Sequence, residues 1–173
     1  MSSSYTFDWY GRINEENLEQ GDFFFPCHVI IPTAHPTEEE APVKVVKYNV
    51  IIMSQSCDLE NKKLNLVLVC PFWPLGEFKK MNSYFNSERG FTDLKRGNSS
   101  GYHLLNKIPF EGDFPDDYIV VDFRSVYGVP FEYLTQLARD TKNRVRLLPP
   151  YKEHLSQAFA RFFMRVGLPV AIG

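Results

Sequence analysis

The chain has 173 residues, of which 44% are hydrophobic, 15% aromatic and 23% charged. This composition excludes an intrinsically disordered chain, and the length suits a single domain spanning residues 1–173. The formal net charge of −2 excludes a surface built throughout to bind phosphate, but it is compatible with a local basic patch.

The first predicted elements are strands. Aromatic and β-branched residues fill 21–32 (GDFFFPCHVIIP), which predicts one or two strands interrupted at Pro26. The next segment (TAHPTEEEAP) has two prolines and three consecutive glutamates, which favours an exposed hairpin tip. The runs VKVVKYNVIIMS and KLNLVLVCPF then predict two strands joined by the polar loop QSCDLENK, at the centre of a sheet.

Helical spacing of apolar residues begins after Phe72 and predicts a helical insertion over about 76–100 that ends in a flexible basic loop, DLKRGNSSGYHLL. DDYIVVDFRSVYGV predicts a further strand, and PFEYLTQLAR predicts a short helix with proline in its first turn. RVRLLPP alternates basic and apolar residues, which predicts a half-exposed strand.

Apolar residues recur three or four positions apart after Pro150, which predicts a C-terminal helix over about 150–166 that ends before Gly167. We expect Arg161 and His154 to lie on its solvent side. The fold class is therefore mainly β with helices (α+β). We expect a barrel core at about 21–72 and 117–149, with the C-terminal helix packed against the sheet.

The motifs GDFFF, HPTEEEAP, NVIIMS, QSCDLENKK and LNLVLVCPF follow one another over residues 21–72. In this order they resemble the MazF/PemK-type growth-inhibitor toxins. The resemblance implies an SH3-like, PemK-like barrel, metal-independent RNA cleavage, pairing into a homodimer, and a place in a bacterial toxin–antitoxin system.

Two departures from the toxin pattern concern its chemistry. The toxins carry an Arg-Pro pair before the second long strand, where this chain has Tyr48 and Asn49, and the nearest cation is Lys47. A lysine cannot reproduce the planar fork of arginine on a phosphate. The toxins also place a hydroxyl residue after Cys-Pro, where this chain has Phe72 and Trp73.

The stretch SQSCDL and the terminal FFMRVGLP are also similar to a group of uncharacterised bacterial proteins. That similarity implies no mechanism.

The candidate site lies in SQSCDLEN, where Ser54, Gln55, Ser56, Cys57 and Asp58 follow a β-branched run. Of these, Ser54 matches the polar strand end of the toxins. Read as a plain turn, the stretch would use its serine and aspartate side chains to cap backbone donors, and its cysteine would be a small buried residue.

One alternative is a zinc site, because tetrahedral zinc accepts mixed sulfur and imidazole ligands. Cys57 and Cys70 would lie on neighbouring strands, joined by Cys27 or His28 and by His103. The chain has no CxxC or HxxxH pair, so we expect neither a metal nor another cofactor.

Two catalytic alternatives remain open. In the first, Cys57 is a nucleophile with His103 as its base and Asp58 as the residue that orients the base. In the second, Asp58 or His103 exchanges protons during RNA cleavage. In this second alternative, one of the cations Lys47, Lys95 and Arg96 would neutralise the charge of the RNA phosphate.

The basic loop is the best local patch for nucleic acid. Lys95 and Arg96 supply charge, and Tyr102 and His103 offer rings on which a base could stack. The alternative interpretation is a mobile surface loop whose glycines permit turns.

Three cysteines and no secretory signal indicate free thiols in a cytoplasmic protein. No apolar run approaches the ~18 residues needed to span a bilayer, so we expect no membrane contact.

Because the toxin arginine and hydroxyl are absent, the sequence favours a non-catalytic binding module whose ligand is RNA or a partner protein. The alternative is a metal-independent endoribonuclease with rearranged catalytic residues. The sequence leaves open whether the protein is an enzyme.

Overall fold

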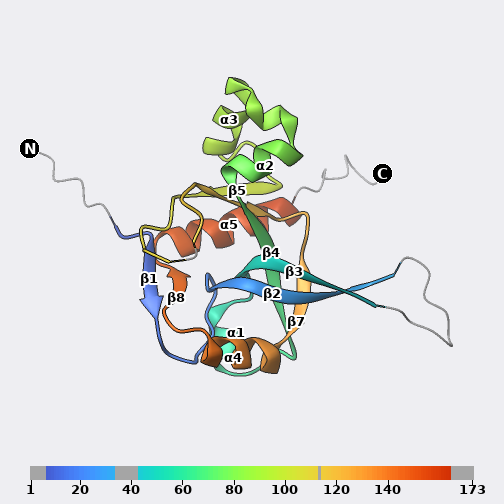
Figure 1. Cartoon of the computed structure of the whole chain (residues 1–173), viewed down its shortest axis with the longest axis vertical. Helices are drawn as coiled ribbons and strands as arrows, with labels where there is room; N and C mark the ends of the chain where they lie inside the picture. Colours follow the sequence, from blue (N-terminus) through green and yellow to red (C-terminus); the bar gives the residue numbers. More distant parts are fainter. Residues whose placement is uncertain (1–6, 34–42, 113, 165–173) are drawn as a thin grey trace, which may run out of the picture.

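The structure is a computed structural model that describes residues 7–33, 43–112 and 114–164 (Figure 1). Within these ranges it is an α+β fold with mostly antiparallel strands, five α-helices and one 3₁₀ helix, η1. In chain order the elements are β1 (Tyr10–Ile13), β2 (Phe23–Pro32), β3 (Val43–Ile52), α1 (Ser56–Glu60), β4 (Leu66–Pro74), α2 (Leu75–Met81), η1 (Ser83–Asn86), α3 (Glu88–Lys95), β5 (Tyr102–Leu105), β6 (Ile119–Asp122), β7 (Tyr127–Pro130), α4 (Phe131–Asp140), β8 (Arg144–Leu147) and α5 (Tyr151–Phe163).

The larger sheet has the strand order β2-β3-β4-β6-β5, with β7 paired to β4 as well. The expected strand–loop–strand unit at its centre is confirmed as β3 and β4, which pair antiparallel. Strand β2 is continuous, and its register on β3 shifts at Phe25 and Pro26, where the sequence predicted an interruption. Strands β1 and β8 form a second sheet, which an isolated bridge from Asp22 to Arg146 joins to the chain just before β2.

No strand pairing closes these sheets into a barrel within the described residues. Strand β1 is instead linked to the segment just after β5 by a side chain, because Tyr10 Oη donates a hydrogen bond to the carbonyl of Asn106 at 2.5 Å. Nearby, Arg12 donates to the carbonyl of Glu111 at 2.8 Å. The expectation of a closed barrel is therefore not met, and the sheets form an open framework.

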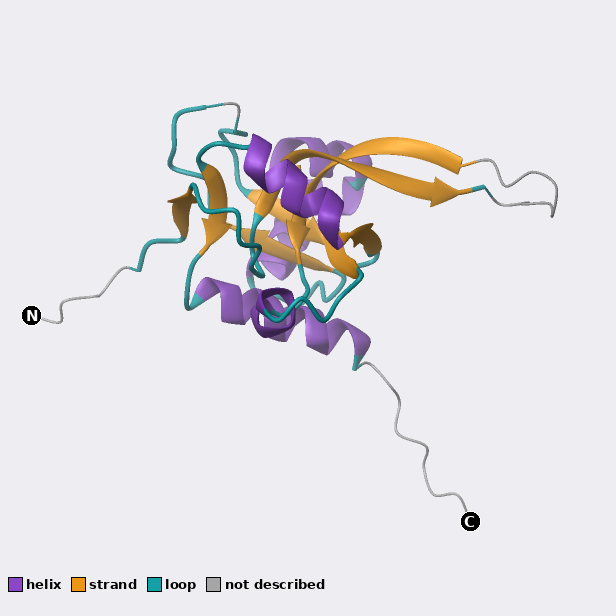
Figure 2. Ribbon diagram, turned by 90° about the horizontal axis from the view of Figure 1, so that it is seen from below, coloured by secondary structure: helices purple, strands orange, loops and turns teal. Residues whose placement is uncertain are grey.

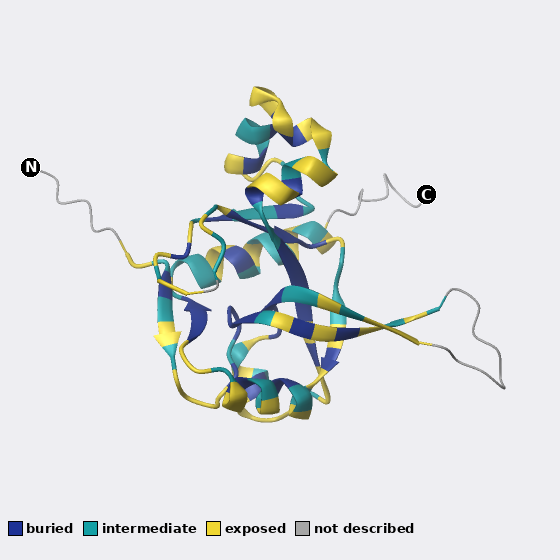
Figure 3. Ribbon diagram, in the orientation of Figure 1, coloured by how far each residue is buried: buried dark blue, intermediate teal, exposed yellow. Residues whose placement is uncertain are grey.

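Two cores lie on opposite faces of the larger sheet. Successive side chains of a strand point to opposite faces. Accordingly, Ile51 packs with Phe23 and the α5 residue Leu155, whereas Ile52 packs with residues of α1 and α4. Both faces are covered where β3 pairs with β4, so residues 50–52 and 69–71 are buried (Figure 3). Each fully buried large apolar side chain contributes about 1.5–3 kcal/mol relative to exposure.

The predicted helical insertion is present as α2, η1 and α3, which we call the helical lobe (residues 75–95). The lobe stands at one end of the molecule, beyond β5 (Figure 1). It has its own small core, in which Phe78 and Phe85 pack against Tyr102.

Helix α5 confirms the predicted C-terminal helix and packs along the sheet (Figure 2). Positions 165 and 166 of that prediction lie outside the described residues, as does the predicted hairpin tip at 34–42. No helix within the described ranges is long and apolar enough to cross a membrane.

Three local predictions were wrong. The loop QSCDLENK contains the short helix α1, because Leu59 turns inward and is buried in the core under α4. The residues GYHLL are not a flexible loop, since Tyr102–Leu105 form β5 and pair with β6. The strand predicted over DDYIVVDFRSVYGV is divided into β6 and β7, which pair with successive parts of β4.

The prediction that RVRLLPP is half exposed was also wrong. Strand β8 is buried along its whole length, and Arg144 and Arg146 are only 1% and 6% exposed. Alternation of basic and apolar residues indicated exposure because charged groups are rarely buried without a partner. Here the partner, Asp22, lies far away in the sequence.

Candidate functional site

The two serines of SQSCDL support the backbone. Ser54 is buried and its Oγ accepts a hydrogen bond from the backbone N–H of Leu68 at 2.8 Å. The Oγ of Ser56 accepts from the backbone N–H of Gln20 at 3.2 Å. Each hydroxyl satisfies a backbone donor that would otherwise lack this partner, so both serines have a structural role.

The other three residues of this stretch are more accessible. Gln55 donates from Nε2 to Ser156 Oγ at 3.2 Å and so links α1 to α5. Cys57 is exposed, which contradicts the prediction that it is a small buried residue. Asp58 lies 4.0 Å from Lys63 Nζ, a partly exposed pair of little energetic weight.

The structure does not bring the two predicted proton-transfer groups together. Asp58 lies on α1, beside α4 at one end of the molecule, whereas His103 lies on β5 at the end that carries the helical lobe (Figure 1). Proton transfer requires reach of about 3 Å, directly or through one water. Asp58 and His103 therefore cannot act on one bond, and the same separation excludes the Cys57–His103 pair.

Residues of the predicted basic loop line a hollow together with residues of a helix distant in the sequence. Lys95 and Arg96 line a hollow of about 310 Å³ together with His103 of β5 and with His154 and Arg161 of α5. We call this the basic hollow. Both α5 residues lie on the solvent side of their helix, as expected, but the fold of the chain places them opposite the basic loop.

His103 is a half-buried titratable group that lines the basic hollow. Its ring stacks near Phe123, with centroids 6.1 Å apart. Burial, with a smaller contribution from the nearby His154 and Arg161, lowers the pKa of His103 to about 4. The imidazole is therefore neutral at pH 7 and offers one hydrogen-bond donor and one acceptor.

Tyr102 does not offer a free ring for base stacking. It is 8% exposed, and its edge contacts with Phe78 and Phe85 belong to the core of the helical lobe. The guanidinium of Arg124 lies 4.4 Å from its ring centroid. Tyr102 therefore forms part of the wall of the basic hollow but is held there by packing.

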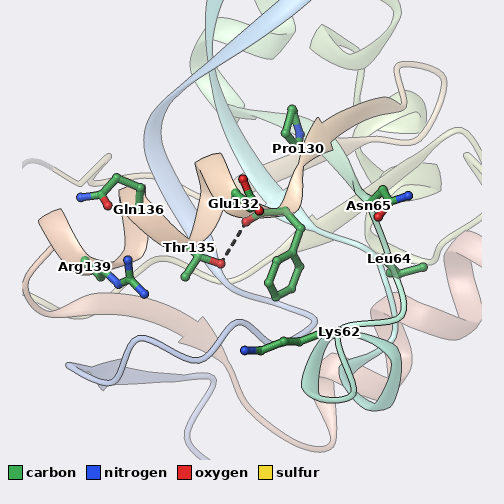
Figure 4. A pocket seen from close by; sticks show the side chains of 9 residues that line it. Lys62, Leu64, Asn65, Pro130, Glu132, Thr135, Gln136 and Arg139 are labelled. Carbon is green, nitrogen blue, oxygen red and sulfur yellow. Dashed lines mark hydrogen bonds between the residues drawn. The ribbon is translucent and has the colours of Figure 1, made fainter.

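A larger concavity lies elsewhere, beside α1 and α4, and consists of two adjoining hollows of about 720 and 540 Å³. Figure 4 shows Lys62 and Arg139 extending toward the same part of it. Arg139 is already paired with Glu16 at 2.9 Å. Further carboxylates, Glu60 and Glu132, also line the two hollows, so this groove has mixed charge and no convergent chemistry.

A buried ionic cluster went unnoticed in the sequence. Asp22 is fully buried and accepts hydrogen bonds from Arg146 Nε at 2.5 Å and Nη2 at 3.0 Å. Arg144 Nε lies 3.2 Å from the same carboxylate without the alignment of a hydrogen bond. Glu19 binds Arg146 at 2.6 Å and Lys152 at 3.2 Å. The cluster ties β8 and α5 to the segment before β2, which gives it a structural role.

The geometry offers no support for the zinc alternative. Across the described residues, which include every ligand considered for it, no group of three His, Cys, Asp or Glu side chains could hold a metal ion. Cys27 and Cys70 are buried free thiols, and burial raises the pKa of both.

A basic hollow at the junction of β5, α3 and α5 is thus the feature with convergent chemistry. Comparisons with known proteins add nothing to it, since the chain matches no protein-family profile, no curated protein and no solved structure.

Proposed function

We propose that the protein is a non-catalytic binding module that holds RNA by its phosphates in the basic hollow. The open framework of curved sheets would then be an SH3-like scaffold of the PemK type, with the helical lobe and α5 completing the site. The observation that carries the proposal is the meeting of Lys95, Arg96 and Arg161, from elements far apart in the sequence, on one concave surface.

The charges of the hollow are available to a ligand. Among the described residues, none of Lys95, Arg96 and Arg161 has a carboxylate within ion-pair distance. Three cations held near one another repel, and a phosphate removes that repulsion. The chain as a whole is slightly acidic, so this local excess of positive charge marks one place for an anion.

A second candidate function is metal-independent RNA cleavage, which two imidazoles in the hollow favour. His103 would accept the proton of a ribose 2′-hydroxyl as that oxygen attacks the phosphorus. His154, as the general acid, would give a proton to the departing 5′-oxygen, leaving a 2′,3′-cyclic phosphate and a 5′-hydroxyl. Arg161 would stabilise the charge on the phosphate oxygens. In this version of the toxin-like reaction, Asp58 takes no part.

Binding is tested by fluorescence anisotropy with a labelled 12-nucleotide RNA across a range of salt concentrations. Three phosphate contacts predict a slope of log K against log salt of about −2. The variants Lys95→Ala, Arg96→Ala and Arg161→Ala should each make the slope shallower by about 0.7. Lys63→Ala, an exposed lysine beside α1, is the matched control and should change nothing.

Absence of RNA binding, or binding that the control weakens as much as the three variants, would refute the proposal and make a partner protein the better candidate ligand. Cleavage is scored on the same RNA in excess chelator. Shortened products with cyclic phosphate ends that vanish in both His103→Gln and His154→Gln would establish the second function in place of the first.

A further inference from the structure

A second group of cations adjoins the basic hollow on the surface of the helical lobe. The ammonium groups of Lys79 and Lys95 lie 4.4 and 4.3 Å from the centroid of the same ring, that of Phe91. Lys79 belongs to α2 and Lys95 to α3, so the packing of the two helices brings these charges to one ring. We call these three residues the Phe91 cluster.

Two features of the lobe hold these like charges together. The face of an aromatic ring attracts cations through its quadrupole. Both lysines also lie in the last turn of their helices, where the helix dipole favours positive charge. Neither lysine has a carboxylate within ion-pair distance in the part of the chain that the structure describes. The cluster is therefore assembled without a protein counter-charge.

The Phe91 cluster and the basic hollow are continuous because Lys95 belongs to both. A ligand phosphate beside Arg161 or Arg96 lies in the hollow, whereas Lys79 lies outside its lining. A single nucleotide held in the hollow would therefore leave Lys79 without a phosphate partner. A polynucleotide whose backbone leaves the hollow past Lys95 meets the Phe91 cluster next.

We propose that the Phe91 cluster is a second phosphate site and that the ligand is a polynucleotide chain spanning both sites, rather than a mononucleotide. This inference rests on the proposed function, since it assumes that the hollow binds nucleic acid. It gives the helical lobe a role in binding: the lobe supplies the cation-bearing surface over which the strand continues.

The test measures affinity against ligand length, using labelled uridine oligonucleotides of 2, 4, 8 and 12 nucleotides. With the unaltered protein, affinity should rise steeply between the shortest and the longest oligonucleotide. Lys79→Ala should weaken binding of the 12-mer roughly three- to fivefold at 0.15 M salt and reduce its salt slope by about 0.7, and leave the dinucleotide unchanged. Arg161→Ala should weaken both.

Lys80→Ala is the matched control, because Lys80 is exposed on the same helix and, among the described residues, makes no cation–π contact with the Phe91 ring. Phe91→Leu keeps an apolar side chain and removes the ring, so it should reproduce the length-dependent loss of Lys79→Ala. Circular dichroism melts of both variants establish that the lobe is still folded.

Equal affinity for dinucleotide and 12-mer would overturn the inference while leaving RNA binding by the hollow intact. So would a Lys79→Ala effect that is absent, matched by Lys80→Ala, or the same at every length. If the unaltered protein binds no oligonucleotide, the proposed function itself fails. The two failures are thus distinguished by the unaltered protein alone.

Discussion

Replacement of Asp22 by asparagine probes the part of the fold that relies most on charge. The Asp22 carboxylate is fully buried and lies within 3.2 Å of the guanidinium groups of both Arg144 and Arg146. It also accepts the backbone N–H of Glu19 at 3.0 Å. Asparagine has nearly the same shape, so the substitution removes the charge and leaves the packing almost unchanged.

The magnitude follows from what remains after the change. Arg144 is 1% exposed and would lose its carboxylate partner, while Arg146 would keep Glu19. Removing one partner of a buried ion pair costs about 3–5 kcal/mol, because an uncompensated charge is left in the interior. This is a large part of the roughly 5–15 kcal/mol by which a domain is stable.

Urea denaturation followed by tryptophan fluorescence measures this effect. With a slope of about 2 kcal/mol per molar urea, Asp22→Asn should lower the midpoint by about 2 M. Asp58→Asn makes the same chemical change at an accessible aspartate whose lysine partner lies 4.0 Å away, and it should shift the midpoint by less than about 0.3 M. Similar midpoints for the two variants would refute the reasoning that the buried cluster holds β8 in place.

Three further outcomes are expected. A thiol reagent at pH 8 should label only Cys57 quickly in the native protein, because Cys27 and Cys70 are buried, and it should label all three cysteines in urea. Mass spectrometry counts the labels, and two or more labels on the native protein would contradict this prediction. Gly90→Ala should lower the melting temperature, since a Cβ there would overlap the backbone carbonyl oxygen of Tyr84, whereas an unchanged melt would show that the lobe adapts. The pKa of His103 falls from 6.5 to about 4 on folding, so the free energy of unfolding should decrease as the pH falls from 6.5 to 4. Below pH 4 this histidine should cause no further decrease. The decline is at most about 3 kcal/mol, and it should be absent from the His103→Gln variant when urea midpoints are compared at each pH.

The local pattern of the sequence was sufficient for most elements. The run of Val50, Ile51 and Ile52 predicted a strand buried on both faces, and its neighbours in the sheet followed from similar runs. The period of about 3.6 residues likewise predicted the helices of the lobe and α5. These signals are local, because the backbone geometry of each element dictates which neighbouring residues share a face.

The short elements were less predictable. Helix α1 is five residues long, too short for a periodic pattern, and one buried residue, Leu59, sets its orientation. Strand β5 begins with Tyr102, which the pattern of glycines and basic residues before it had assigned to a loop. In both places a tertiary contact outweighs the local propensity of the chain.

The site depended on contacts that no local pattern contains. The sequence identified Lys95, Arg96 and His103 as a basic patch, and only the tertiary structure showed that Arg161 lies opposite them. It also showed that α1, which carries Asp58, lies at the end of the molecule away from the helical lobe (Figure 1).

The same distinction explains the error about β8. The pairing of Arg146 with Asp22 spans 124 positions in the chain. An arginine can be buried when the folded chain places a carboxylate beside it. The alternation of basic and apolar residues over seven positions does not show whether such a carboxylate will be there. The sequence alone therefore determined most of the strands and helices, while the tertiary structure decided which charges are buried as pairs and which lie on the surface of the basic hollow.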